Sequence, residues 1–178
     1  MELVTKLEKQ ISKWLKNVPH LPTNAQKWLA DNIWWIAVVG AIVAGIAFLF
    51  SLGALFSAIA LLGAVGNPVY RYYITQGVTA WSLVTAIVGL VFLAVQALIL
   101  GLAVNPLKAK QHKGWRILFI AWLVSVVAVV IDAVLTLSPI SFIFSLIFGA
   151  VGIAIGAYLI FEIRERFIGS TAKKAKKS

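Results

Sequence analysis

The chain has 178 residues, of which 61% are hydrophobic and only 12% are charged. Soluble domains are about 45–50% apolar and about 25% charged, so this chain has too few polar residues to cover the surface of a soluble fold. The net charge is +10 and there is no cysteine, which excludes disulfide bonds, thiolate metal sites and a cysteine nucleophile.

Residues 1–32 precede the first long apolar run and have the pattern of an amphipathic helix. No secretory signal peptide is recognised in them, so we expect them to be retained. Apolar residues recur every three or four positions, and lysines occupy the other faces. Such a helix is expected to lie in the membrane interface; a cytosolic packing surface for the loops is the alternative. The apolar positions are Leu3, Val4, Leu7, Ile11, Trp14, Leu15 and Val18.

The segment "VPHLP" (18–22) is expected to end this helix, and Thr23 to Gln26 has the form of a capping box. The box predicts a second helix that starts near Asn24 and continues into the first apolar run. That run, 33–66, is long for one membrane span and short for two. We assign 33–51 to a span and 52–66 to an apolar outer-side or re-entrant helix, with a long, kinked first span as the alternative.

The sequence therefore predicts an all-α polytopic membrane protein, because each remaining run reaches the ~20 residues that cross a bilayer. The membrane domain covers 33–166, and a basic tail follows at 167–178. Four spans are expected, at about 33–51, 78–104, 115–137 and 140–163.

The basic residues indicate the orientation of the spans. They cluster before residue 33, in the 105–116 loop and after residue 163, and Arg71 is the only exception. Four spans place all three clusters on one side, whereas a hairpin over 33–66 would separate them. The positive-inside rule favours four spans with both termini in the cytoplasm, and we expect a bacterial cytoplasmic membrane with anionic lipid on that side.

Aromatic and basic side chains near the ends of the runs are expected at the lipid interface, where amphipathic rings are favoured. Pro106 is expected to end the second span, because proline cannot continue the helical hydrogen-bond ladder. Ser138 and Pro139 are expected to form the outer turn between the last two spans. The interface residues are Trp14, Trp34, Trp35, Trp81, Trp115, Lys108, Lys110 and Lys113.

A row of small residues, Ser145, Gly149, Gly152 and Gly156, lies on one face of the last span. Small residues let helix backbones approach closely in lipid. The row predicts either packing of the four helices within one chain or a homo-oligomer contact.

No constellation of catalytic, metal-binding or cofactor-binding residues is recognised, and we expect neither an enzyme nor a nucleic-acid partner. His20 and His112 are interpreted as solvated loop residues. Glu162 and Glu165, interleaved with arginines, are interpreted as a solvated interface cluster.

The polar residues expected inside the membrane domain are Asp132, Gln96 and Arg71. An ionisable residue in a span is a candidate functional residue. Asp132 lies about 25 Å along the helix from Trp115, near the outer end of the third span. There it is expected to pair with Arg71, or to hydrogen-bond to Ser141 or Ser145.

The block 105–119 resembles a loop-to-helix junction found in small bacterial multi-pass membrane proteins of uncharacterised function. The matching features are Pro106, Lys108, Lys110, Gly114, Trp115 and Phe119, together with the amphipathic N-terminus and "YLIFEIR" at 158–164. The resemblance implies a membrane protein with an amphipathic N-terminal helix, and it implies no catalytic residue.

These features predict a structural or accessory membrane component that acts through helix packing and lipid contacts, with a homo-oligomer or other membrane subunits as partners. The alternative is a small transporter or channel formed by oligomerisation. Such a pathway would have only Asp132, Gln96, Thr85, Ser125 and Ser145 as polar lining.

Overall fold

The computed structural model describes residues 2–63, 80–135 and 139–168, and within these ranges all secondary structure is helical. A short helical stretch, 164–168, follows α6 after a turn at Ile163. The helices are α1 (Glu2–Leu15), α2 (Thr23–Gly63), α4 (Ala80–Lys108), α5 (His112–Leu135) and α6 (Pro139–Glu162).

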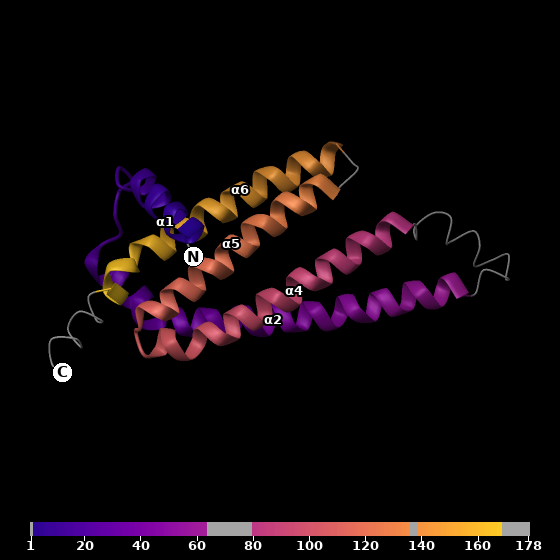
Figure 1. Cartoon of the computed structure of the whole chain (residues 1–178), viewed down its shortest axis with the longest axis horizontal. Helices are drawn as coiled ribbons and strands as arrows, with labels where there is room; N and C mark the ends of the chain where they lie inside the picture. Colours follow the sequence, from indigo (N-terminus) through magenta and orange to yellow (C-terminus); the bar gives the residue numbers. More distant parts are fainter. Residues whose placement is uncertain (1, 64–79, 136–138, 169–178) are drawn as a thin grey trace.

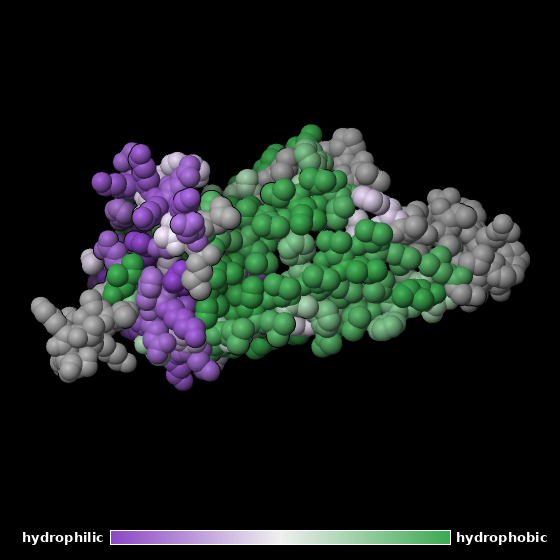
Figure 2. All heavy atoms as spheres, in the orientation of Figure 1, coloured by the Kyte–Doolittle hydropathy of each residue, from purple (hydrophilic) through white to green (hydrophobic). Residues whose placement is uncertain are grey.

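The four long helices pack in chain order, α2 against α4, α4 against α5 and α5 against α6, while α1 lies beside the end of α6 (Figure 1). Hydrophilic side chains gather at one end of the molecule, and hydrophobic ones cover most of the remaining face (Figure 2). We call that hydrophilic end, formed by α1, the α4–α5 loop and the end of α6, the polar end.

Three helices are long and apolar enough to cross a membrane, Thr23–Leu62, Trp81–Lys108 and His112–Leu135. In α6 the apolar stretch found among the described residues is shorter, Ile147–Glu162. The all-helical class and the presence of membrane-length apolar helices are therefore shown.

α2 is one continuous helix, so the separate outer-side or re-entrant helix expected at 52–66 is wrong for its described part, 52–63. The range 23–66 contains no proline. The Ser57 hydroxyl donates back to the Gly53 carbonyl at 2.9 Å, which leaves the helical backbone ladder intact. With 41 residues, α2 is about 60 Å long, about twice the thickness of a bilayer core.

The start of α2 confirms the expected helix from about residue 24, but the capping box is wrong. The Gln26 side-chain amide does not turn back to Thr23. It donates to the Leu21 carbonyl at 3.0 Å and to the Glu162 carboxylate at 2.9 Å. Glu162, a partner far away in the chain, binds the Gln26 side chain that the capping box would have used.

Pro106 does not end α4, which continues to Lys108. The helix ends in a Schellman motif, in which Gln111 N–H donates to the Pro106 carbonyl and Lys110 N–H to that of Leu107, both at 2.9 Å. Lys110 occupies the left-handed position with φ 50°. Proline so near the end of a helix removes a single ladder bond, so the last half-turn still forms.

Gly114 brings the backbones of α4 and α5 into direct contact where α4 ends and α5 begins. A Cβ on Gly114 would lie 2.5 Å from the Leu107 nitrogen and 2.8 Å from the Pro106 oxygen. This contact places Gly114 opposite Leu107 and so fixes the register of two antiparallel helices. Counting residues along both helices from this contact places Gln96 on α4 near the level of Ser125 on α5, and Gly89 on α4 near the level of Asp132 on α5.

Trp115 belongs to the buried core, so its assignment to the lipid interface is wrong. Its side chain is 0% exposed, and its indole Nε1–H donates to the Ile160 carbonyl at 2.8 Å. Its ring also stacks on Phe119, with the centroids 5.4 Å apart. Phe167 is equally buried, so the folded part extends past residue 166, where a tail was expected to begin.

The row of small residues on α6 divides into two groups. A Cβ on Gly149 would lie 2.4 Å from Val129 Cγ1, and one on Gly156 would lie 2.9 Å from Trp122 Cδ1, so both face α5. At Gly152 nothing lies within 4 Å. The Ser145 side chain is outside the described part of the structure. Gly149 and Gly156 therefore pack α6 within the chain.

Candidate functional site

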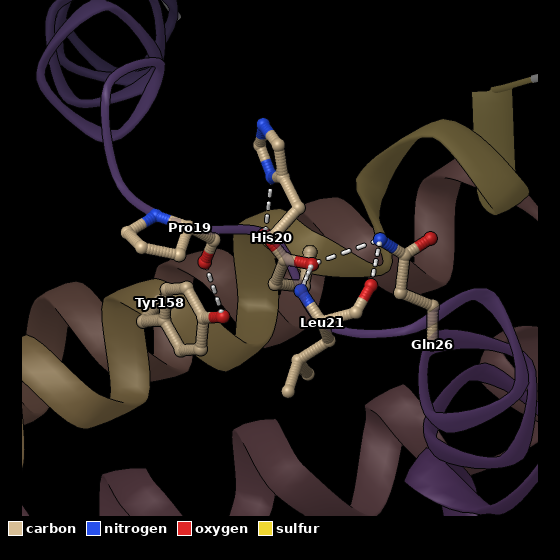
Figure 3. A network of polar contacts seen from close by, with 6 residues as sticks. Pro19, His20, Leu21, Gln26 and Tyr158 are labelled. Atoms are coloured by element: carbon tan, nitrogen blue, oxygen red, sulfur yellow. Dashed lines mark hydrogen bonds and ion pairs between the residues drawn. The ribbon is translucent and has the colours of Figure 1, made fainter.

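The polar end is organised around the carboxylate of Glu162, whose side chain is 4% exposed. His20 Nδ1 lies 2.7 Å from Oε1, and Oε2 accepts the Leu21 backbone N–H and the Gln26 amide, each at 2.9 Å. Figure 3 shows His20, Leu21 and Gln26 converging on this carboxylate. Tyr158 adds a bond from its hydroxyl to the Pro19 carbonyl at 2.7 Å. We call these residues the Glu162 cluster.

The interpretation of Glu162 as solvated is therefore wrong, because it is buried and bonded to the linker between α1 and α2. His20 contacts that carboxylate through its ring Nδ1, although the His20 side chain is 64% exposed. His112 is also not a simple solvated residue: it lies in the first turn of α5 and stacks on Trp115, with the centroids 5.9 Å apart. Sequence spacing could not indicate the contacts of Glu162, since they join positions about 140 residues apart.

Removal of the Glu162 carboxylate is expected to loosen the linker. Glu162→Ala should lower the free energy of unfolding by about 2 kcal/mol, because buried donors lose a charged acceptor. Glu165→Ala is the matched control, as Glu165 is exposed three positions later. Trypsin cleavage after Lys16 in detergent-purified protein, together with the melting temperature, would measure the difference. Equal cleavage rates in both variants would contradict this role.

α1 is attached to the helical stretch that follows α6 through a second carboxylate, that of Glu8, which is 7% exposed. Its Oε1 accepts bonds from Arg164 Nε at 2.9 Å and from a terminal guanidinium nitrogen at 2.6 Å. Val4 and Ile11 pack against the core on the same side of the helix. Glu8 lies at the border of the apolar face, a position that gave no sign of burial in the sequence.

The rest of the apolar face of α1 stays open. Leu7 is 40% and Trp14 is 68% exposed. Of the other expected interface residues, Trp35 is 53% exposed, and Trp34 lies under Lys108, whose Nζ is 5.0 Å from the ring centroid. Lys110 pairs with Asp31 of α2, and Lys113 is exposed.

No group of three or more His, Cys, Asp or Glu side chains that could hold a metal ion occurs among the residues that the structure describes. The Glu8 and Glu162 carboxylates take part in contacts that join α1, the linker between α1 and α2, and the chain around the end of α6. These contacts hold those segments together.

The candidate functional site is a cleft of about 410 Å³ between α4 and α5, in the half that leads away from the polar end. We call it the α4–α5 cleft. Most of its lining is aliphatic or aromatic, and the polar exceptions are Thr85, Gln96, Ser125 and Asp132. Two of the polar residues singled out in the sequence, Asp132 and Gln96, thus share one cleft. Arg71, the expected partner of Asp132, lies outside the described residues, as do the side chains of Ser141 and Ser145.

The hydroxyl donors of the cleft are already committed to the helix backbones. Thr85 donates to the Ser82 carbonyl at 2.9 Å and Ser125 to the Ala121 carbonyl at 3.2 Å. The Gln96 side-chain oxygen is buried without a hydrogen-bond partner in the described part of the chain. The polar atoms left to face the cleft are therefore mainly acceptors.

Three of the four polar groups, those of Gln96, Ser125 and Asp132, lie at two levels along the helices. Gln96 and Ser125 lie about 15 Å along the helix from Trp115, and Asp132 lies about 25 Å from it. Beyond Asp132, the Trp81 indole Nε1–H donates to the Leu135 carbonyl at 3.0 Å and joins the ends of α4 and α5 that lie away from the polar end. Trp81, expected at an interface, is 43% exposed there.

Comparison with known proteins adds no relative: no family model, no curated protein and no solved structure matches this chain.

Proposed function

We propose that this protein is a structural or accessory component of a bacterial cytoplasmic membrane, which acts by packing its helices against other membrane subunits. One observation supports this proposal above all. Only 17%, 11% and 22% of the apolar windows of α2, α4 and α5 are buried inside the chain. Helices that pack mainly against their sequence neighbours leave wide apolar faces, which lipid or further helices must cover.

The proposed orientation has four spans, with α6 as the fourth, and the polar end in the cytoplasm. The lysines of α1, the α4–α5 loop and the arginines after α6 all belong to that end, as the positive-inside rule requires. The exposed Leu7 and Trp14 would place α1 in the lipid interface, where its lysines would meet anionic headgroups.

Photo-crosslinking in native membranes tests the accessory role. A photoreactive residue would be placed at Leu102 on α4, Val134 on α5 or Phe50 on α2, which are 70%, 70% and 77% exposed, with buried Ala103 as the control. We expect a discrete protein adduct from at least one exposed position and none from Ala103. Adducts with lipid alone at every exposed position would overturn the proposal.

The open position at Gly152 provides the test for a second copy of the chain. Because the chain has no cysteine, a single one at Gly152 reports only on contacts between copies. Ala157 on the same helix, 7% exposed, is the control position. A disulfide-linked dimer from Gly152→Cys and not from Ala157→Cys would make the partner a second copy; no dimer would exclude that face.

Transport is the second candidate, and the α4–α5 cleft is the observation that favours it. It gathers four of the five polar residues that could line a pathway. Ion or solute flux in proteoliposomes that Asp132→Asn abolishes and Glu165→Gln preserves would favour transport over the accessory role. If proteoliposomes that contain this protein show no flux of any solute that control proteoliposomes transport, the result would count against transport.

A further inference from the structure

We infer that the α4–α5 cleft binds lipophilic ammonium compounds, molecules that carry a hydrogen-bond-donating cation on an apolar body. The inference goes beyond the accessory role and does not depend on it.

The polar groups of the cleft select for a donor. A ligand would meet the Gln96 oxygen and the hydroxyl oxygens of Thr85 and Ser125, whose own hydrogens point to their helix backbones. Apart from the Gln96 amide nitrogen, the uncommitted side-chain groups are acceptors. In a bilayer core no bulk water is present to donate hydrogen bonds to these acceptors, so a ligand with N–H groups is favoured.

The charge of the cleft selects for a cation. Among the described residues that line the cleft, Asp132 is the only ionisable one and none is basic. An ionised carboxylate accepts several hydrogen bonds at once, so Asp132 can receive an ammonium N–H beside another contact. Attraction between opposite charges is several times stronger near a protein surface or interior than in water.

The walls of the cleft select for an apolar body. Phe92, Leu93 and Val124 are among the many apolar lining residues, and the volume of about 410 Å³ lies in the range of small-molecule sites. Gly89 helps to create this space: nothing lies within 4 Å of a Cβ built on it, and it sits near the level of Asp132. The ammonium group would lie at Asp132, and the apolar body would extend inwards past Gln96 and Ser125.

Binding of radiolabelled dodecylammonium to the purified full chain in lipid nanodiscs tests this inference without any substitution. An alkylammonium has a pKa near that of lysine, about 10.4, and is charged at pH 7. We expect saturable binding that unlabelled dodecylammonium displaces. Dodecyltrimethylammonium should compete more weakly because it lacks N–H donors, dodecanol at least about tenfold more weakly because it lacks the charge, and dodecyl sulfate not at all. Equal competition by all four compounds would overturn the inference.

Substitutions then locate the site. Asp132→Asn and Gln96→Leu should each weaken binding about tenfold. Gly89→Leu should abolish it by filling the cleft while the carboxylate remains. If Asp132→Asn fails to fold, Gly89→Leu and the competition series still decide the question. Unchanged binding in a folded Gly89→Leu variant would exclude this cleft.

Two serines with the same local bond supply a matched control. Ser57 and Ser125 each donate to the carbonyl four residues earlier, but only Ser125 lines the cleft. Ser125→Ala should weaken dodecylammonium binding and Ser57→Ala should not; an equal loss in both would contradict the assignment. Binding without flux would uphold this inference and reject the transport candidate, while the crosslinking experiment tests the accessory role separately.

Discussion

Gly114→Ala is expected to destabilise the protein by about 3 kcal/mol, at the upper end of the usual cost of overpacking. The added methyl group would lie 2.5 Å from a backbone nitrogen and 2.6 Å from a backbone carbonyl carbon of the α4 end. Backbone atoms cannot move aside as a flexible side chain can, so the two helices must separate at this corner. Melting of the detergent-purified protein, followed by the loss of the monodisperse species after heating, measures the effect.

Gly101→Ala is the matched control, because it adds the same methyl group to α4 with nothing within 4 Å. Its effect should be close to zero or stabilising by up to about 1 kcal/mol, since alanine is the better helix former. Equal melting temperatures for Gly114→Ala and Gly101→Ala would show that α4 and α5 are not in contact at Gly114.

Trp115→Ala is expected to cost about 4 kcal/mol, because it removes a large, fully buried side chain. The substitution also deletes the bond to the Ile160 carbonyl and the stacking on Phe119. Trp115→Phe retains a ring and loses the bond, so its cost should be near 1 kcal/mol. Unfolding in a graded detergent mixture, followed by the far-ultraviolet circular dichroism signal, gives the comparison.

Trp28→Ala is the control for this position, since Trp28 is 64% exposed at the start of α2. Truncation of an exposed tryptophan removes few packing contacts, so Trp28→Ala should lower the free energy of unfolding by much less than Trp115→Ala. If Trp115→Ala proved as mild as Trp28→Ala, the buried core at the polar end would be wrong.

The residues of the candidate site were predictable one by one, but their grouping was not. Asp132 and Gln96 stand out in the sequence because polar side chains are rare in apolar runs of this length. Whether they share a cleft depends on how α4 and α5 align, and the backbone contact between Gly114 and Leu107 sets that alignment. Nothing in the local pattern of either helix specifies it.

The failures of local reasoning have the same origin. Trp115, Glu162 and Glu8 follow patterns typical of interfacial or solvated residues, yet all three are buried. Each is buried by partners far away in the chain: Ile160 for Trp115, the 20–26 segment for Glu162 and Arg164 for Glu8. Local periodicity records only which face of a helix is apolar, and it cannot identify what covers that face.

The sequence by itself determined the membrane-length apolar helices, the absence of cysteine chemistry and the gathering of basic residues at a few places, because these follow from composition and run length. Only the tertiary structure decided that Trp115 belongs to the core and that four polar residues line one cleft. The physical reason is that helix length and polarity are local properties, whereas burial, register and hydrogen-bond satisfaction arise from contacts between distant segments.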